Sequence, residues 1–317
     1  MGVDGRSVDK PLRVIVIAGP TATGKTRLAV EVAHALGTRI LSADSRQVYR
    51  GLDIGTGKDL EEYRQVDPPI TVELIDVAEP EEIYTLHDYQ GACRAALRAC
   101  QATAPDRPVV LAGGTGLYLE AMIRDYFLAT VPEDPAFRQQ MMIRDIETLA
   151  GELMTFDPEL HAKTDQTSKK RIVRSLEVAR ALRHGQEMQS VPFDVPVHYD
   201  VFATHVDRAT RISAIDRRLD VRLDSGLIEE VAGLMDRGLG RDRLDMLGME
   251  YREIATYVRG ETTREQMITR LGHCIHRLSK RQMSYLRGME RRGIPVTWIS
   301  PSNSSLVIER ARSRTPK

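Results

Sequence analysis

The sequence predicts an α/β protein with a parallel β-sheet as its core and a helical segment inserted into that core. Three observations support this fold class. Short apolar runs alternate with longer runs of helical periodicity, as in parallel sheets with crossover helices. A glycine-rich turn joins the first run to a helix, and from Val131 charged helical sequence replaces the alternation. We therefore expect a first core part at 11–128, an insertion at 129–190, a second core part at 191–300 and a loosely ordered tail at 301–317.

The first predicted strand leads into a phosphate-binding motif. After the apolar run 13–18, the chain reads Gly-Pro-Thr-Ala-Thr-Gly-Lys-Thr, the full G-x-x-x-x-G-K-[ST] pattern, and then continues with helical periodicity to Leu36. In such a turn, backbone N–H groups and the positive helix end face a di- or triphosphate. The lysine adds a charge, and the Thr26 hydroxyl can bind Mg²⁺. The motif predicts a P-loop NTPase-like core whose phosphate-binding residues are Gly19, Thr21, Thr23, Gly24, Lys25 and Thr26.

Two further predicted strands end near this turn. The run 39–43 is followed by Asp44, and the run 108–112 leads through two glycines to Thr115. Because ligands bind beyond the carboxyl ends of parallel strands, Asp44 and Thr115 should lie beside the phosphate turn. Asp44 is then a Mg²⁺ anchor, a general base or only a turn-forming residue. An ordinary P-loop NTPase has an aspartate that holds Mg²⁺ at the end of a strand such as 108–112. Here glycines and a threonine follow that strand, so hydrolysis of ATP or GTP is less expected.

The remaining segments complete the predicted core and insertion. Alternating or continuous apolar patterns predict strands, and apolar residues at helical spacing predict helices. A stretch with three glycines and a lysine predicts a loop. By these criteria we expect a loop at 51–58, strands at 69–76, 198–204 and 293–299, and helices at 84–100, 137–153, 209–226 and 262–292.

Two of the helical segments carry clusters of basic residues. Around 169–178, Arg171 and Arg174 are three residues apart and share a helix face. The segment 262–292 carries more basic residues than its two acidic ones can balance. A solvated helix face is the usual interpretation of such a stripe, and contact with a phosphodiester backbone is the alternative. The basic residues of this second segment considered for such a contact are Arg270, Arg277, Lys280, Arg281, Arg287, Arg291 and Arg292.

Composition limits the classes of function. Lys and Arg together number 45, as do Asp and Glu, so no overall positive charge attracts nucleic acid. Cys93, Cys100 and Cys274 are odd in number and lack C-x-x-C spacing, which suits a reducing cytosol. The first residues do not resemble a signal peptide, and no apolar run reaches membrane-spanning length. We expect a cytoplasmic protein without a membrane partner.

Five segments, taken together and in order, resemble the tRNA dimethylallyltransferases (tRNA isopentenyltransferases). The matching segments are 19–26, 44–58, 113–118, 171–177 and 280–285. Members of this family transfer the dimethylallyl group of dimethylallyl diphosphate to N6 of the adenosine beside the anticodon, and they release diphosphate with Mg²⁺ present. The resemblance implies dimethylallyl diphosphate and the anticodon stem-loop of tRNA as partners, and Mg²⁺ as cofactor. We expect a monomer.

The resemblance also assigns roles to individual residues. Asp44 would take the proton from N6, while Thr115 and Arg218, with Lys25, would stabilise the charge on the leaving diphosphate. The family usually has a second arginine four residues before Arg218, where this chain has Ala214, and Arg211 or Arg217 is the residue that could compensate. The residues expected to contact the RNA substrate are Thr21, Ser45, Gln47, Arg171, Arg174, Lys280, Arg281 and Gln282.

Three other functions remain open from the sequence. An adenylate isopentenyltransferase would use the same donor on free AMP, ADP or ATP, but it needs neither the inserted helices nor the basic helix. A P-loop small-molecule kinase would consume ATP. A relative that binds tRNA without turnover would fit the missing arginine at Ala214.

Overall fold

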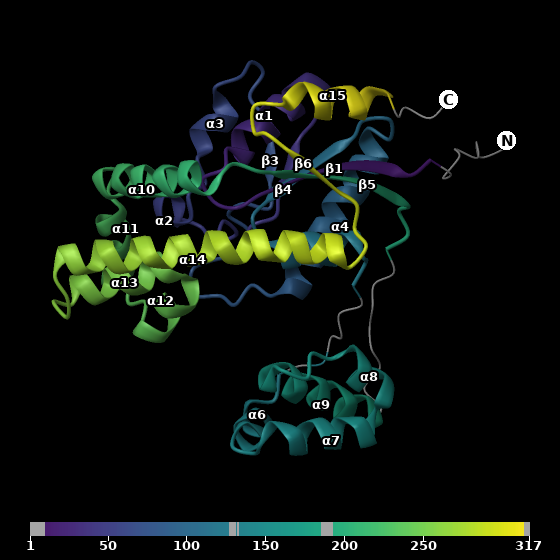
Figure 1. Ribbon diagram of the computed structural model, residues 1–317, viewed down its shortest axis with the longest axis vertical. Helices are drawn as coiled ribbons and strands as arrows, with labels where there is room; N and C mark the ends of the chain where they lie inside the picture. The colour runs from purple at the N-terminus through teal and green to yellow at the C-terminus, as the bar shows by residue number, and fades with distance from the viewer. Residues whose placement is uncertain (1–9, 127–130, 132, 185–192, 314–317) are drawn as a thin grey trace. The chain divides into compact units, whose positions relative to one another are not determined.

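The computed structural model describes residues 10–126, 131, 133–184 and 193–313 (Figure 1). It divides into two compact units, one made of the chain up to Asp125 and from Asp194 onward, the other of Tyr126–Phe193. The ends predicted for the insertion, at 129 and 190, lie outside the described residues, as do the first nine residues and the last four.

A six-stranded parallel sheet forms the centre of the first unit, which confirms the predicted fold class (Figure 1). The strand order is β3-β2-β4-β1-β5-β6, so the strand before the phosphate motif lies between β4 and β5. β-Branched and aliphatic residues dominate these strands because the central ones are buried on both faces. The strands are β1 Leu12–Ala18, β2 Ile40–Ser42, β3 Val72–Glu73, β4 Val109–Gly113, β5 Val197–Thr204 and β6 Val296–Ile299.

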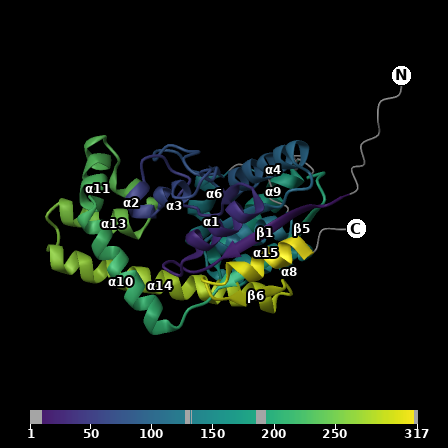
Figure 2. The ribbon, with the colours of Figure 1, turned by 90° about the horizontal axis from the view of Figure 1, so that it is seen from above.

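Helices surround this sheet, and Figures 1 and 2 show α15 beside α1. Alternate residues of β1 face opposite sides of the sheet, and Ile15 and Ile17 pack into the cluster that α1 and α15 complete. The helices of this unit are α1 Lys25–Leu36, α2 Asp53–Thr56, α3 Leu60–Arg64, α4 Leu86–Thr103, α5 Gly116–Ile123, α10 Arg208–Asp224, α11 Leu227–Asp236, α12 Arg241–Leu247, α13 Met249–Val258, α14 Arg264–Arg291 and α15 Ser304–Ser313.

Two predictions about this unit were wrong. The described residues after Pro301 are not a loosely ordered tail, because 304–313 form α15, which buries Val307 and Ala311 in the cluster next to α1. The strand expected over 69–76 is reduced to β3, since Leu74 and Asp76 adopt positive φ angles that end the extended conformation.

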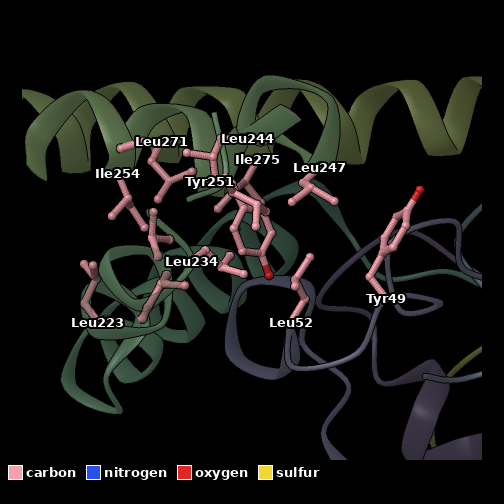
Figure 3. Close-up of a cluster of buried hydrophobic side chains, with 14 of the residues drawn as sticks. Tyr49, Leu52, Leu223, Leu234, Leu244, Leu247, Tyr251, Ile254, Leu271 and Ile275 are labelled. Atoms are coloured by element: carbon pink, nitrogen blue, oxygen red, sulfur yellow. The ribbon is translucent and has the colours of Figure 1, made fainter. Parts of the chain in front are cut away.

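A second hydrophobic cluster joins α10–α14 to the segment after β2 (Figure 3). Leu223, Leu234, Leu244 and Leu271 come from four of these helices, and Leu52 comes from the other segment. The helices after β5 therefore do not simply cover the sheet. They form a helical lobe with its own core, to which the segment near α2 is attached.

The second unit is a small helical bundle with a separate core. Its helices are α6 Pro135–Met142, α7 Ile146–Phe156, α8 Pro158–Lys163 and α9 Lys169–Arg183. Phe137, Leu149, Leu153 and Ile172 are among the side chains that it buries. The single helix predicted over 137–153 is in fact α6 and α7, because the Asp145 side chain accepts a hydrogen bond from the Thr148 amide and begins a new helix.

Candidate active site

The phosphate motif forms a tight turn between β1 and α1. Ala22 and Gly24 have positive φ angles of 59° and 73°, and α1 begins at the next residue, Lys25. Gly19 has no room for a side chain, because a Cβ atom there would lie 2.0 Å from Oγ1 of Thr204. The turn thus has the strand–loop–helix geometry that the motif predicts.

The hydroxyl of Thr23 points into the protein. It donates to the Pro20 carbonyl at 2.8 Å and lies 2.7 Å from the Thr204 hydroxyl, and Thr23 is only 2% exposed. A phosphate contact of Thr23, which stays a prediction, would therefore have to come from its backbone. Thr23 closes the turn and fastens it to β5, and only its backbone remains for phosphate.

Gln282 of α14 connects the phosphate turn to the end of β4. Its Oε1 accepts from the Thr21 amide at 2.9 Å, and its Nε2 donates to the Gly114 carbonyl at 3.0 Å. Both polar atoms are engaged within the protein, so in this structure Gln282 bridges the two loops, and its contact with RNA stays a prediction. The same bond occupies the Thr21 amide, so the Thr21 hydroxyl is the polar group of that residue left for a ligand.

Asp44 and Thr115 lie at neighbouring strand ends, as expected. The Asp44 Oδ1 accepts from the Arg46 amide at 3.0 Å, and no donor is assigned to its Oδ2 among the described residues. The Thr115 hydroxyl accepts from the Ser45 amide at 2.9 Å. Gly113 allows this approach, because a Cβ atom there would lie 2.1 Å from the Ala43 carbonyl oxygen. Asp44 is thus a turn-forming residue and also has one oxygen free for chemistry.

Gln47 follows in the same segment but faces the protein. Its Oε1 accepts from the Ser42 hydroxyl at 3.1 Å, and its Nε2 donates to the Gly57 carbonyl at 2.9 Å. In this structure Gln47 therefore connects β2 to the segment around α2, and its contact with RNA stays a prediction.

Positive charge is concentrated at the phosphate turn. Burial, together with the nearby guanidinium groups of Arg218 and Arg222, lowers the pKa of Lys25 to about 8, against the opposing effect of Asp44. Arg218 of α10 donates to the Thr21 hydroxyl at 3.4 Å and forms an ion pair with Asp59. A bound anion would favour the charged lysine, so the site is prepared for phosphate.

The glycine-rich stretch 51–58 is not the open loop that was predicted. It contains α2, whose first amides, from Asp53 to Gly55, donate to the Glu230 carboxylate at 2.7–3.0 Å. Lys58 is fully buried and donates to the Tyr49 carbonyl at 2.9 Å and to Asp53 at 2.6 Å. Lys58 is therefore a structural residue and cannot reach a ligand.

A cavity of about 920 Å³ lies in front of Asp44 and Thr115. One wall is α14, from which Arg277, Lys280 and Arg281 project. The last two are exposed and have no ion-pair partner among the described residues. Not every basic residue of α14 belongs to this face, since Arg292 pairs with the buried Glu120. The full set of lining residues is Asp44, Ser45, Arg46, Gly114, Thr115, Asp245, Gly248, Met249, Arg252, Cys274, Arg277, Leu278, Lys280, Arg281, Gln282 and Ser284.

The two arginines predicted to bind RNA in the second unit differ from each other. Arg174 contacts the Glu177 carboxylate and donates to the Val131 carbonyl at 2.7 Å, so it holds the bundle together. Arg171 pairs only at the surface, with Asp165 at 3.0 Å, and 66% of its side chain is exposed. Arg171 keeps the exposure that a phosphate contact needs.

No described helix has both the length and the apolar character required to span a bilayer.

Comparisons with known proteins agree with this geometry. A family model described as IPP transferase matches residues 47–289, more than half of the chain. The tRNA dimethylallyltransferase 1 of Porphyromonas gingivalis is 42% identical over 286 residues, which cover 90% of this chain and 93% of that protein. The tRNA dimethylallyltransferase 1 of Hahella chejuensis is 41% identical over 295 residues, covering 93% and 94%.

A solved structure is similar as well. The crystal structure of the tRNA isopentenylpyrophosphate transferase from Bacillus halodurans matches with a TM-score of 0.67 and 28% identity, and the match covers 95% of each chain. Together with the phosphate turn and the two strand ends that face it, these matches confirm the resemblance inferred from the five sequence segments: the chain belongs to the IPP transferase family, that of the tRNA dimethylallyltransferases.

Proposed function

We propose that this protein transfers the dimethylallyl group of dimethylallyl diphosphate to N6 of the adenosine beside the anticodon of tRNA. The observation that carries the proposal is the proximity of three features. Asp44, with one free carboxylate oxygen, and the exposed basic residues Lys280 and Arg281 line one cavity. The phosphate turn adjoins this cavity through Gln282, which lines the cavity and accepts a hydrogen bond from the Thr21 amide. The phosphate turn would bind the diphosphate donor, Asp44 would accept the proton, and the basic residues would bind the RNA backbone.

The chemistry follows from the charges at this cavity. The bond between C1 of the dimethylallyl group and the diphosphate oxygen breaks, and a bond from N6 to C1 forms. Negative charge gathers on the leaving diphosphate, where Lys25 and Arg218 stabilise it. The proton of N6 passes to the free oxygen of Asp44, because an amine conjugated to a purine is a poor nucleophile until that proton is removed.

The residues present also fit Mg²⁺ arriving with the donor. No cluster of three or more metal-binding side chains occurs in the part of the chain that the structure describes. Mg²⁺ is often held by one or two protein oxygens together with substrate phosphates, and Thr26 and Asp44 can supply such oxygens. When bound, Mg²⁺ would neutralise part of the diphosphate charge.

The acceptor must leave the anticodon-loop stack to reach Asp44. Lys280 and Arg281 line the cavity beside this carboxylate, where they can bind the phosphates that flank the extruded adenosine. Arg171 is a further candidate contact, in the second unit. We further propose that the enzyme is a monomer and acts in the cytoplasm, where tRNA is modified.

The proposal is tested by supplying labelled dimethylallyl diphosphate and Mg²⁺ in parallel reactions with unmodified tRNA, AMP and ATP. Label is expected in tRNA alone. Label in AMP or ATP would instead identify an adenylate isopentenyltransferase. Retention of tRNA without label in any acceptor would identify a relative that binds tRNA without turnover, and ATP consumption without label transfer would identify a kinase.

A further inference from the structure

Two arginines of α10 approach the same glycine beside the phosphate turn. Arg218 and Arg222 are four residues apart and therefore share a helix face. A Cβ atom on Gly57 would lie 1.5 Å from Nη2 of Arg222 and 2.6 Å from Nη2 of Arg218. Arg222 also donates to the Gly55 carbonyl at 3.5 Å. Both guanidinium groups are thus brought to the segment around Gly57, and Arg218 also reaches the Thr21 hydroxyl of the phosphate turn.

The charges around these arginines are incompletely paired. Arg218 forms an ion pair with Asp59, and Arg46 forms one with Glu250 at 2.5 Å. Within the described ranges, neither Arg222 nor Lys25 has a carboxylate at ion-pair distance. Half-burial of a guanidinium group without a carboxylate partner is costly, so this arrangement calls for an anion that the chain itself does not provide.

The lowered pKa of Arg222 agrees with the interpretation that this site lacks an anion. Burial, and secondarily the neighbouring charge of Arg218, lowers the pKa of Arg222 to about 10. The same two arginines contribute to the lowered pKa of Lys25. A diphosphate placed among the three cations would relieve this repulsion for all of them.

We propose that Arg222 is the second diphosphate-binding arginine of this enzyme, in place of the arginine that the family pattern has at Ala214. The inference rests on the proposed function. Positions 214, 218 and 222 follow one another at intervals of four along the same face of α10. The pair of arginines is therefore kept, but it is shifted by one helical turn, to the side of Arg218 where Gly57 leaves room for the Arg222 guanidinium and the Gly55 carbonyl accepts a hydrogen bond from it.

The test measures binding of inorganic pyrophosphate with Mg²⁺ by calorimetry, using the full chain. Arg222→Gln is expected to weaken binding about tenfold, since a charge-assisted contact is lost. Arg222→Lys should lose less, because it keeps the charge. Arg217→Gln, an exposed neighbour on α10, is the matched control and should bind as the wild type does. Circular dichroism and the melting temperature establish that each variant is folded.

A second-site variant tests the shift itself. Ala214→Arg added to Arg222→Gln should restore most of the lost pyrophosphate affinity. The inference is overturned if folded Arg222→Gln binds pyrophosphate like the wild type, or if the double variant binds as weakly as Arg222→Gln alone.

These outcomes are separate from those of the transfer assay. If the wild type labels no tRNA while its pyrophosphate binding depends on Arg222, the proposed function fails and the diphosphate site stands. If tRNA is labelled and pyrophosphate binding ignores Arg222, only the role of Arg222 fails.

Discussion

The bridge made by Gln282 allows a sharp test of how the phosphate turn is held. Gln282→Ala removes the hydrogen bonds to the Thr21 amide and the Gly114 carbonyl. Each such hydrogen bond contributes about 1 kcal/mol net. The variant therefore loses about 2 kcal/mol of the free energy that holds the phosphate turn against the end of β4. We expect pyrophosphate affinity to fall by about tenfold to thirtyfold. In the variant the turn is no longer held in its binding conformation, and part of the binding free energy is used to order it.

The assay compares two affinities in the same variant. Pyrophosphate binding is measured by calorimetry and tRNA binding by filter retention, and tRNA affinity should change little in Gln282→Ala. Arg281→Ala, at the adjacent exposed position, is the matched control and should do the opposite. If Gln282→Ala weakened tRNA binding and left pyrophosphate binding unchanged, the bridging role would be refuted and direct contact with RNA restored.

Four further outcomes are expected. Asp44→Asn should reduce dimethylallyl transfer by about 10²–10⁴-fold with nearly unchanged tRNA affinity, and unchanged turnover would remove Asp44 from the role of base. Joint reversal of Lys280 and Arg281 to glutamate should weaken tRNA binding and lower its salt dependence by about one unit of slope per phosphate contact, whereas an unaltered slope would make this a solvated face. Because the pKa of Lys25 is lowered to about 8, this amine loses its proton as the pH rises from 7 to 9, and pyrophosphate affinity should fall over that range. Lys25→Arg should flatten this pH profile of affinity. An identical profile in both proteins would mean that a different group titrates. Lys58→Met should lower the free energy of unfolding by about 1–3 kcal/mol in a denaturant titration, because it leaves the buried Tyr49 carbonyl without its donor and removes the ion pairs with Asp53 and Asp76. A stability equal to that of the wild type would contradict the structural role of Lys58.

The sequence allowed the prediction of features that depend on neighbouring residues. The phosphate turn was predictable because its glycines and Lys25 fix both local geometry and charge within eight positions. The expected helix over 262–292 agrees closely with α14, since its apolar residues recur at helical spacing over many turns. Asp44 and Thr115 were predicted to lie together from one general rule about parallel strand ends.

Features that depend on distant partners could not be predicted. Gln282 and Thr21 are 261 residues apart, and nothing in either segment indicates that they form a hydrogen bond. Glu230 accepts from the Ile54 amide at the start of α2 across 176 residues, so part of the glycine-rich stretch predicted as a loop is helical. α15 was missed because it buries few apolar side chains, chiefly Val307 and Ala311, and its stability comes from packing beside α1.

The uninterrupted length of α14 has a consequence for how this chain can change. The helix has 28 residues and is about 42 Å long at 1.5 Å per residue. Along it, Ile275 packs into the helical lobe, Gln282 holds the phosphate turn, and the Tyr285 hydroxyl donates to Glu120. One inserted residue between the first two would turn everything beyond it by about 100°, moving Gln282 off the turn. Single substitutions on the exposed face of α14 away from Lys280 and Arg281 should therefore be tolerated, whereas insertions and deletions should be tolerated only in the loops at its two ends.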